Sequence, residues 1–196
     1  MKWNNLYLIK LSPDKIINES STTYRKYYSI PKGRRFVPLN DQQEKTKADS
    51  GWTILGQGSL SGLTLSDKLM IVAHGSHTDV AGRQYNVLAN ELEGWGLQEV
   101  GLITFKCCNV GRLKFLEDFV RFAGTVSGIK IGWVKAYRGP SVTLPGGLIK
   151  PTERIGHVSS HGAKSGQKRY KIVPGLTAFT LPGSRYIAYA DLEEED

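Results

Sequence analysis

The chain has few of the residues that hold small cross-linked or metal-bound domains together. Only two of its 196 residues are cysteines, and only four are histidines. The cysteines, Cys107 and Cys108, are adjacent, and adjacent cysteines rarely pair with each other because the intervening peptide strains the disulfide ring. The sequence therefore predicts no disulfide scaffold, and a reducing compartment is the simpler interpretation.

Long apolar segments are also missing. No run of 18 apolar residues exists, so we expect no membrane span. Residues 1–15 alternate polar and apolar side chains and carry three lysines, without the apolar core or cleavage site of a secretory signal. We therefore expect a cytoplasmic protein, or one secreted or delivered without a cleaved signal peptide. The remaining composition, 40% hydrophobic and 22% charged, is that of one globular domain spanning 1–196.

The net charge of +8 is concentrated in two flanks. Residues 1–50 carry ten Lys/Arg against five Asp/Glu, and residues 150–185 carry seven against one. The middle of the chain is near balance, and the tail 191–196 is acidic. Such flanks around a core at about 60–140 predict an anion site if they meet in space.

Short apolar runs alternate with amphipathic segments in the centre of the chain. Runs at 68–73, 100–105 and 129–137 predict strands, and the spacing at 86–92 and 113–122 predicts helices. In the second helix Leu113, Leu116, Phe119 and Val120 fall on one face. Strands and helices in alternation are typical of an α/β fold with a parallel sheet, in which ligands bind beyond the carboxyl ends of the strands.

The flanking segments are less regular. Residues 5–11 predict a strand, and 34–39 predict a short edge strand because Pro38 cannot donate to a ladder. The rest of 14–66 shows little periodicity, with one short strand expected inside 51–62. Residues 139–185 are rich in Gly, Pro, Ser and Thr, which predicts hairpins or a flap with short strands at 170–173 and 178–181.

A histidine and a cysteine follow two of the apolar strands. The run LMIVA ends in His74-Gly75, and LITF is followed by Lys106-Cys107 and then Cys108. Neighbouring parallel strands bring both side chains to one edge of the sheet. A thiolate nucleophile needs an imidazole nearby, and a glycine lets substrate approach backbone N–H groups. The sequence predicts a catalytic pair of His74 and Cys108.

This pair of motifs resembles clan CD cysteine peptidases, and is closest to the self-processing peptidase domains of bacterial toxins. The resemblance covers Asp67 to about Pro140 and implies a caspase-like three-layer sandwich with a C-terminal β-hairpin or flap. It implies a cysteine endopeptidase that forms a thioester on Cys108, of the kind found as a bacterial effector or toxin-processing protease. His74 would protonate the leaving amine, and the backbone N–H groups of Gly75 and Cys108 would hold the oxyanion.

Two further features follow from the resemblance. Toxin-processing members orient the histidine with an upstream acidic residue, and no pattern selects among Asp14, Glu19, Asp41, Glu44, Asp49 and Asp67. They also use inositol hexakisphosphate as an allosteric activator bound in a basic cleft. The candidates for that anion site are Arg34, Arg35, Lys164, Lys168, Arg169 and Lys171.

Other interpretations stay open from the sequence. His74-x-x-His77 and His157-x-x-x-His161 have the spacing of metal ligands, although adjacent cysteines seldom chelate one zinc together. Cys107 is expected to be a core residue. Aromatics mixed with charge at 24–35 are typical of single-strand nucleic-acid binders, but no recognised motif accompanies them. The alternative function is a non-enzymatic caspase-like binding domain or a basic nucleic-acid-binding module.

Overall fold

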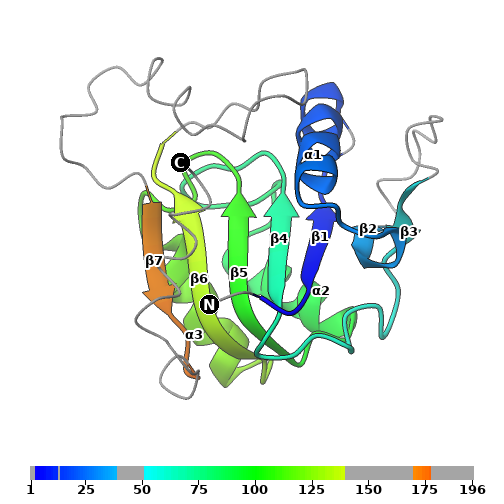
Figure 1. Cartoon of the computed structure of the whole chain (residues 1–196). Helices are drawn as coiled ribbons and strands as arrows, with labels where there is room; N and C mark the ends of the chain where they lie inside the picture. The colour runs from blue at the N-terminus through cyan, green and yellow to red at the C-terminus, as the bar shows by residue number, and fades with distance from the viewer. Residues whose placement is uncertain (1–2, 13, 39–50, 140–169, 178–196) are drawn as a thin grey trace.

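A computed structural model describes residues 3–12, 14–38, 51–139 and 170–177. The described strands form one seven-stranded sheet in the order β3-β2-β1-β4-β5-β6-β7 (Figure 1). Every neighbouring pair is parallel except β6 and β7, which are antiparallel. The strands are β1 (Leu6–Lys10), β2 (Arg35–Val37), β3 (Thr53–Ile54), β4 (Lys68–Val72), β5 (Glu99–Lys106), β6 (Lys130–Tyr137) and β7 (Tyr170–Pro174).

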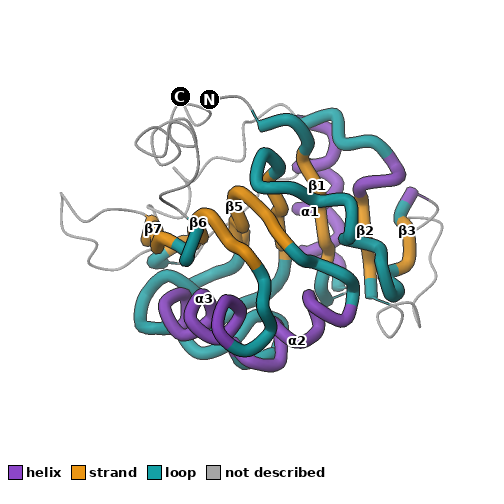
Figure 2. Tube along the Cα trace, turned by 90° about the horizontal axis from the view of Figure 1, so that it is seen from below, coloured by secondary structure: helices purple, strands orange, loops and turns teal. Residues whose placement is uncertain are grey.

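Helices cover both faces of the sheet, which gives a three-layer α/β arrangement. The described α-helices are α1 (Lys15–Tyr27), α2 (Tyr85–Gly94) and α3 (Phe115–Thr125), and a 3-10 turn, η1, spans Lys32–Arg34. Figure 2 shows α2 and α3 together on one side of the sheet and α1 on the other. None of the described helices is long and apolar enough to span a membrane.

The larger core lies between the sheet and the layer formed by α2 and α3. Ile71 and Phe105 from the central strands pack there with Leu88 of α2 and Phe119 of α3. The Phe105 and Phe119 rings meet edge to face with centroids 5.4 Å apart, a favoured aromatic geometry. Burial of this apolar surface supplies the main driving force for the layer.

The smaller core, on the α1 side, mixes apolar residues with lysines. Leu8 and Met70 pack against Ile17 and Tyr24 of α1. Four lysines of the strands are also less than 9% exposed, and their stems cover apolar surface. The ammonium groups of three of them lie over aromatic rings: Lys10 over Trp52, Lys68 over Tyr28, and Lys106 over both Tyr24 and Tyr137; the fourth lysine is Lys135.

Most of the predicted central elements are confirmed. β4, β5 and β6 are parallel neighbours, and α2 and α3 connect them as crossover helices. The strand predicted at 129–137 is therefore confirmed as β6, although Trp133 is only partly buried. The expected strand at 170–173 is β7, and the one expected at 178–181 lies outside the described residues.

Three expectations were wrong in detail. The segment at 34–39 forms β2, which lies between β1 and β3 and is not an edge strand. α3 begins at Phe115, so Leu113 precedes the helix and is 51% exposed instead of joining the apolar face. The largest omission is α1, a helix of 13 residues in a segment that showed little periodicity.

Candidate active site

The two predicted catalytic residues follow adjacent parallel strands at equal offsets. The last paired residues of β4 and β5 are Val72 and Lys106, so His74 and Cys108 each lie two residues beyond that pair. The intervening residues, Ala73 and Cys107, are both buried in the larger core. His74 and Cys108 therefore leave the sheet at the carboxyl ends of two neighbouring strands.

Gly75 shows that the two motifs are in direct contact. A Cβ atom added at Gly75 would lie 2.8 Å from Cys107 Cβ, 3.0 Å from the Cys108 carbonyl oxygen and 2.7 Å from Val110 Cγ2. All three neighbours belong to the cysteine segment, residues 107–110. The His-Gly turn therefore packs on the backbone at Cys108, and only glycine fits there without displacing it.

Asp14 supplies the acidic partner of the histidine that the sequence left unassigned. His74 Nε2 and Asp14 Oδ2 are 3.0 Å apart, and the two side chains are 54% and 40% exposed. β1 lies next to β4, and Asp14 follows β1 just as His74 follows β4. Asp14 and His74, which are 60 positions apart in the sequence, thus lie in contact beyond the carboxyl ends of β1 and β4.

The second oxygen of Asp14 holds the start of α1. Asp14 Oδ1 accepts hydrogen bonds from the backbone N–H groups of Ile16 at 2.9 Å and Ile17 at 3.2 Å. This is the N-cap arrangement, which satisfies amides that have no partner within the helix. The cap fixes the carboxylate, and the fixed carboxylate in turn limits the orientation of the imidazole.

The two cysteines have different environments. Cys107 is 1% exposed, and its thiol donates to the Ile71 carbonyl over 3.7 Å, while Cys108 is partly exposed. Burial, with a smaller contribution from Cys108, raises the pKa of the Cys107 thiol far above its usual range. Since the thiolate is the nucleophilic form, Cys107 is unreactive at neutral pH, and Cys108 is the accessible thiol.

The segment that carries Cys108 is attached to the last two strands. The backbone N–H of Asn109 donates to Gly139 at 3.0 Å, and that of Gly111 donates to Tyr137 at 2.7 Å. Asn109 has a φ of 61°, a left-handed conformation that asparagine tolerates better than most residues. Lys171 of β7 donates to the Leu113 carbonyl near the end of the segment. These contacts hold the backbone on both sides of the thiol.

The segment after His74 folds back as a tight loop. The backbone N–H of Ala81 donates to the His74 carbonyl at 2.8 Å, and the N–H of Ser76 donates to the Asp79 carbonyl at 3.0 Å. The Ser76 hydroxyl donates to the Asp79 carboxylate. The backbone of His74 is therefore held by its own loop and its side chain by Asp14.

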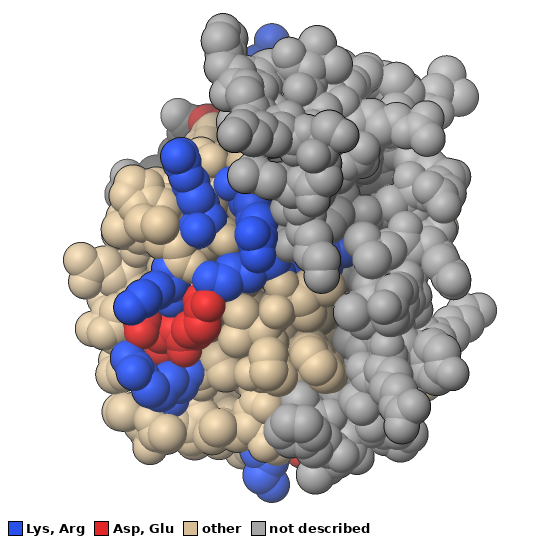
Figure 3. Space-filling view, turned by 90° about the vertical axis from the view of Figure 1, so that its left-hand side faces the viewer, with Lys and Arg blue, Asp and Glu red and all other residues tan. Residues whose placement is uncertain are grey.

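The described residues of the predicted anion site do not lie together. Arg34 and Arg35 border or begin β2, near one edge of the sheet, whereas Lys171 is in β7 at the other edge. Lys171 forms an ion pair with Glu117 at 2.6 Å, and Figure 3, which faces the β7 side, shows basic side chains around an acidic group. Lys164, Lys168 and Arg169 lie outside the described residues.

Arg34 and Arg35 make different contacts, although they are adjacent in the sequence. The Arg34 guanidinium lies over the Tyr7 ring, with 5.5 Å to its centroid. Arg35 Nε donates to the Ile30 carbonyl at 2.5 Å, and burial together with the charge of Arg25 lowers the Arg35 pKa. The two guanidiniums thus have different partners, and Lys171 lies in the strand at the other side of the sheet, so the described residues do not bring these three together.

The other chemistries considered from sequence have less support in the described part of the chain. No group of three or more His, Cys, Asp or Glu side chains is placed there to hold a metal ion. His157 and His161 lie outside it. Of the aromatics proposed to stack on nucleic acid, Tyr24 is 3% exposed in the smaller core between α1 and the sheet and is not accessible to a base, whereas Tyr27 is 42% exposed.

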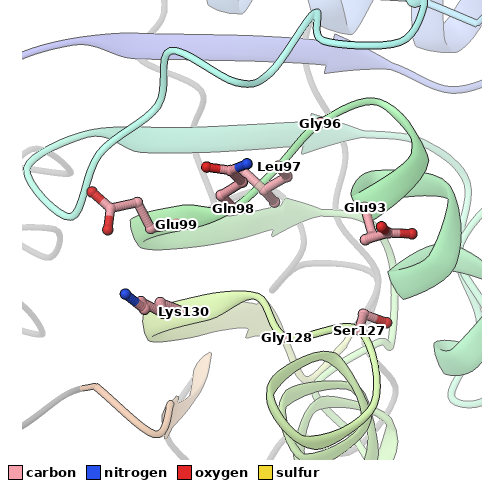
Figure 4. Close-up of a pocket in the computed structure, with 8 residues that line it drawn as sticks. All are labelled: Glu93, Gly96, Leu97, Gln98, Glu99, Ser127, Gly128 and Lys130. Carbon is pink, nitrogen blue, oxygen red and sulfur yellow. The ribbon is translucent and has the colours of Figure 1, made fainter.

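A polar hollow lies at the end of the sheet where the central strands begin, opposite to the end that carries His74 and Cys108 (Figure 4). It forms where β5 and β6 begin, beside the end of α2 and the turn before β6. The residues that line it are Glu93, Gly96, Leu97, Gln98, Glu99, Ser127, Gly128 and Lys130. The hollow is therefore separated from Cys108 by the length of β5 and belongs to no predicted site.

The comparisons with known proteins found no relative of this chain. Neither the protein families, nor the curated proteins, nor the solved structures searched contain a match to this chain. The site therefore rests on its own geometry.

Proposed function

We propose that this chain is a cysteine endopeptidase of caspase-like fold in which Cys108 is the nucleophile, His74 the general acid and Asp14 the residue that orients His74. The proposal extends the resemblance to clan CD peptidases by filling the acidic position. One observation carries it: His74 is held by Asp14 on one side, while Gly75 packs against Cys107 and Cys108 on the other.

The proposed reaction has two steps. The proton of the Cys108 thiol passes to His74 as Cys108 Sγ attacks the scissile carbonyl carbon, and the C–N bond breaks as His74 donates that proton to the leaving amine. A thioester then joins the substrate acyl group to Cys108. In the second step water attacks this thioester with His74 accepting its proton, which releases the carboxylic acid and regenerates the thiol.

Developing negative charge on the substrate oxygen requires nearby donors. The backbone N–H groups of Gly75 and Cys108 are proposed for this role, because both belong to the turn where the two motifs touch. A side chain at position 75 would lie against Cys107, Val110 and the Cys108 carbonyl, so glycine is needed for the two segments to approach this closely.

Asp14 contributes by orientation. Its Oδ2 lies at Nε2 of His74, which leaves Nδ1 as the ring nitrogen available for proton exchange with the substrate. The pair is partly exposed, so its electrostatic contribution is screened by solvent and its effect on geometry dominates.

Inositol hexakisphosphate remains part of the proposal as an activator, on the strength of the resemblance. Arg34, Arg35 and Lys171 are not assigned to its site, because they lie at two edges of the sheet. A substrate protein or peptide is the proposed partner, with self-processing and external cleavage both compatible with the site.

The proposal is tested by peptide cleavage. Purified chain is incubated with a mixture of peptides of known sequence, with and without inositol hexakisphosphate, and products are identified by mass spectrometry. Cleavage by the wild type that is lost in Cys108→Ala and retained in Cys107→Ala is expected.

Two outcomes would reject it. Cleavage that survives Cys108→Ala would point to a contaminating peptidase. Intact peptides in every condition would favour a non-enzymatic caspase-like binding domain or a basic nucleic-acid-binding module, the latter showing affinity that falls steeply with salt.

A further inference from the structure

β5 and β6 present a cluster of polar side chains on the α1 side of the sheet. The larger core, under α2 and α3, takes alternate residues of these two strands, so the residues between them face the α1 side. Four of these residues end in hydrogen-bond donors and are called the donor face: Thr104, Lys106, Trp133 and Lys135. Thr104 and Lys135 lie directly opposite each other in the register of the two strands.

Two atoms of the donor face are buried and make no hydrogen bond in the described part of the chain. They are Thr104 Oγ1 and Trp133 Nε1. Folded proteins seldom leave buried polar atoms without a partner, because each has lost its hydrogen bonds to water. The indole N–H can only donate, and a hydroxyl can also donate. An occupant of this face therefore has to supply acceptor atoms.

The lysines decide which acceptor is favoured. Lys106 and Lys135 of the donor face are 8% and 1% exposed, and Lys10 and Lys68, on the same side of β1 and β4, are 2% and 1% exposed. Four ammonium groups in one buried layer give this side of the sheet a positive potential, which solvent screens little. A carboxylate, which is both anionic and an acceptor, suits the lysines and the two buried atoms together.

The donor face is buried although α1 lies to one side of it. α1 is the described helix on this side, and it packs over β1 and β4 (Figure 2). Thr104 and Lys135, on the next two strands, are nevertheless each 1% exposed. The donor face is therefore an interior surface of the protein, and its occupant is sought within this chain.

Charge selects one segment of the chain as that occupant. Residues 191–196 carry five Asp/Glu and no Lys/Arg. The other long segments outside the described residues differ in charge, since 39–50 carry three Asp/Glu against two Lys/Arg and 140–169 carry one against five. The acidic segment 191–196 is thus complementary to the donor face.

The chain is also long enough to bring this segment to the donor face. Thr177, the last described residue, donates its backbone N–H to the Ile131 carbonyl of β6 at 3.2 Å. Lys135 is four residues further along β6, about 13 Å away at the rise of a strand. Residues 178–190 separate Thr177 from the acidic segment, and an extended chain covers about 3.3 Å per residue.

We propose that the acidic segment 191–196 docks on the donor face, where its carboxylates accept hydrogen bonds from Thr104, Trp133 and Lys135. Docking fixes the acidic segment across β5 and β6 and stabilises the fold. It is independent of the proposed peptidase function, since Cys108 and His74 take no part in it.

The first test uses the wild-type chain and therefore depends on no variant. A carbodiimide joins a carboxylate to a lysine amine where the two are in contact, and mass spectrometry of the digested monomer identifies the joined residues. Crosslinks from 191–196 to Lys135 or Lys106 are expected. Crosslinks to other lysines alone, or no crosslink from this segment, would overturn the proposal.

The second test measures the Tm by thermal denaturation. A neutralised segment keeps its length and combines five changes: Asp191→Asn, Glu193→Gln, Glu194→Gln, Glu195→Gln and Asp196→Asn. It should lower the Tm of the wild type by roughly 3 °C or more. In Lys135→Met the same five changes should lower the Tm by much less, because the two partners act as one unit.

Lys130→Met is the matched control, because Lys130 is an exposed lysine of the same strand, at its start. In that background the five changes should lower the Tm as much as in the wild type. Equal falls in the Lys135→Met and Lys130→Met backgrounds would overturn the proposal. A Tm that ignores the five changes but rises with sodium tripolyphosphate in the wild type, and not in Lys135→Met, would also overturn it by assigning the donor face to an external anion.

Discussion

At the scale of single residues, the two oxygens of Asp14 have separate tasks. One oxygen caps α1 and the other holds His74. Asparagine caps helices about as well as aspartate but carries no charge for the imidazole, whereas alanine lacks both functions. Substitutions of Asp14 can therefore separate its effect on the stability of α1 from its effect on the proposed catalysis.

Asp14→Asn should leave the free energy of unfolding within about 0.5 kcal/mol of the wild type and lower kcat/KM roughly tenfold. Asp14→Ala should show the same kinetic loss and also destabilise the fold by about 1 kcal/mol. Chemical denaturation and peptide cleavage measure the two effects. Wild-type activity in Asp14→Asn would remove Asp14 from the mechanism.

Gly75 should tolerate no side chain. Gly75→Ala places a Cβ within 2.7–3.0 Å of the cysteine segment, so we expect destabilisation by about 1–3 kcal/mol and loss of activity. Gly94→Ala is the matched control, because Gly94 is helical and nothing lies within 4 Å of an added Cβ. That variant should be more stable than the wild type by about 0.5–1 kcal/mol. Equal effects in thermal denaturation would contradict this explanation.

The raised pKa of Cys107 predicts a stability change at alkaline pH. Above about pH 8.5 the unfolded thiol loses its proton while the buried one keeps it, so the unfolded state binds fewer protons. The free energy of unfolding should then fall with rising pH, by up to about 1.4 kcal/mol per unit from this group. Cys107→Ala should show a shallower decline between pH 8 and 10 in urea titrations. Parallel curves for the two proteins would show that Cys107 ionises normally.

The sequence indicated His74 and Cys108 as a candidate pair but did not select Asp14 as the partner of His74. An apolar run that ends in a reactive residue is a local pattern, and two such runs one helix apart indicate adjacent strands. The partner of His74 is 60 positions away and depends on β1 lying beside β4, which no local pattern encodes. An N-cap signal was present at Asp14, followed by Ile17 and Tyr24 at helical spacing, and it could have identified the helix.

At the scale of elements, α1 was missed because its buried face is barely apolar. Ser20, Ser21 and Thr23 are buried beside Ile17 and Tyr24, so the helix has a mean hydropathy typical of a loop. Small hydroxyl residues let the helix lie close to the sheet, and their hydroxyls donate to backbone carbonyls one turn earlier, as Thr23 does to Glu19 at 3.0 Å. The helix is therefore indicated by the N-cap at Asp14 and the helical spacing of Ile17 and Tyr24, and not by its mean hydropathy.

The packing of α1 should depend on Ile17 and not on Ile16. Ile17→Ala removes a side chain that is 4% exposed, with an expected loss of about 2–4 kcal/mol in the free energy of unfolding. Ile16→Ala removes one that is 62% exposed and should change stability by less than about 0.5 kcal/mol. Urea denaturation of both variants gives the comparison. Similar losses would mean that α1 is not seated as described.

The position of β2 in the sheet differs from the one predicted. Pro38 led to the prediction of an edge strand, yet β2 has neighbours on both sides. Its pairing ends at Val37, one residue before the proline, so the missing N–H is never required by the ladder. Proline marked the end of the strand correctly, and the position of the strand in the sheet depended on contacts distant in sequence.

At the scale of the whole molecule, the order of central elements was predictable and the distribution of charge was not. Apolar runs alternating with helices specify parallel crossovers, and β4, β5 and β6 follow that rule. Four lysines that count toward the net charge are instead buried on the α1 side of the sheet. Only Lys10 of these belongs to the basic flanks, and the other three come from the middle of the chain.

The convergence of three strand exits is the central feature of the molecule. β1, β4 and β5 are consecutive in the sheet, and the residues that follow them are Asp14, His74 and Cys108. The sheet places the segments that carry these residues at the carboxyl ends of three adjacent strands, although each residue is separated from the next by more than 30 positions in the sequence. The proposed function requires that this arrangement make Cys108 reactive toward a peptide carbonyl.

The most direct test is the intact mass of the protein after incubation with a peptidyl electrophile that carries leucine at its reactive end. The measurement is made with and without inositol hexakisphosphate on the wild type, Cys108→Ala, Cys107→Ala and His74→Ala. The account predicts a single added label that is lost in Cys108→Ala, retained in Cys107→Ala and slowed in His74→Ala. No label in any condition, or a label on Cys107 that is indifferent to His74, would contradict it.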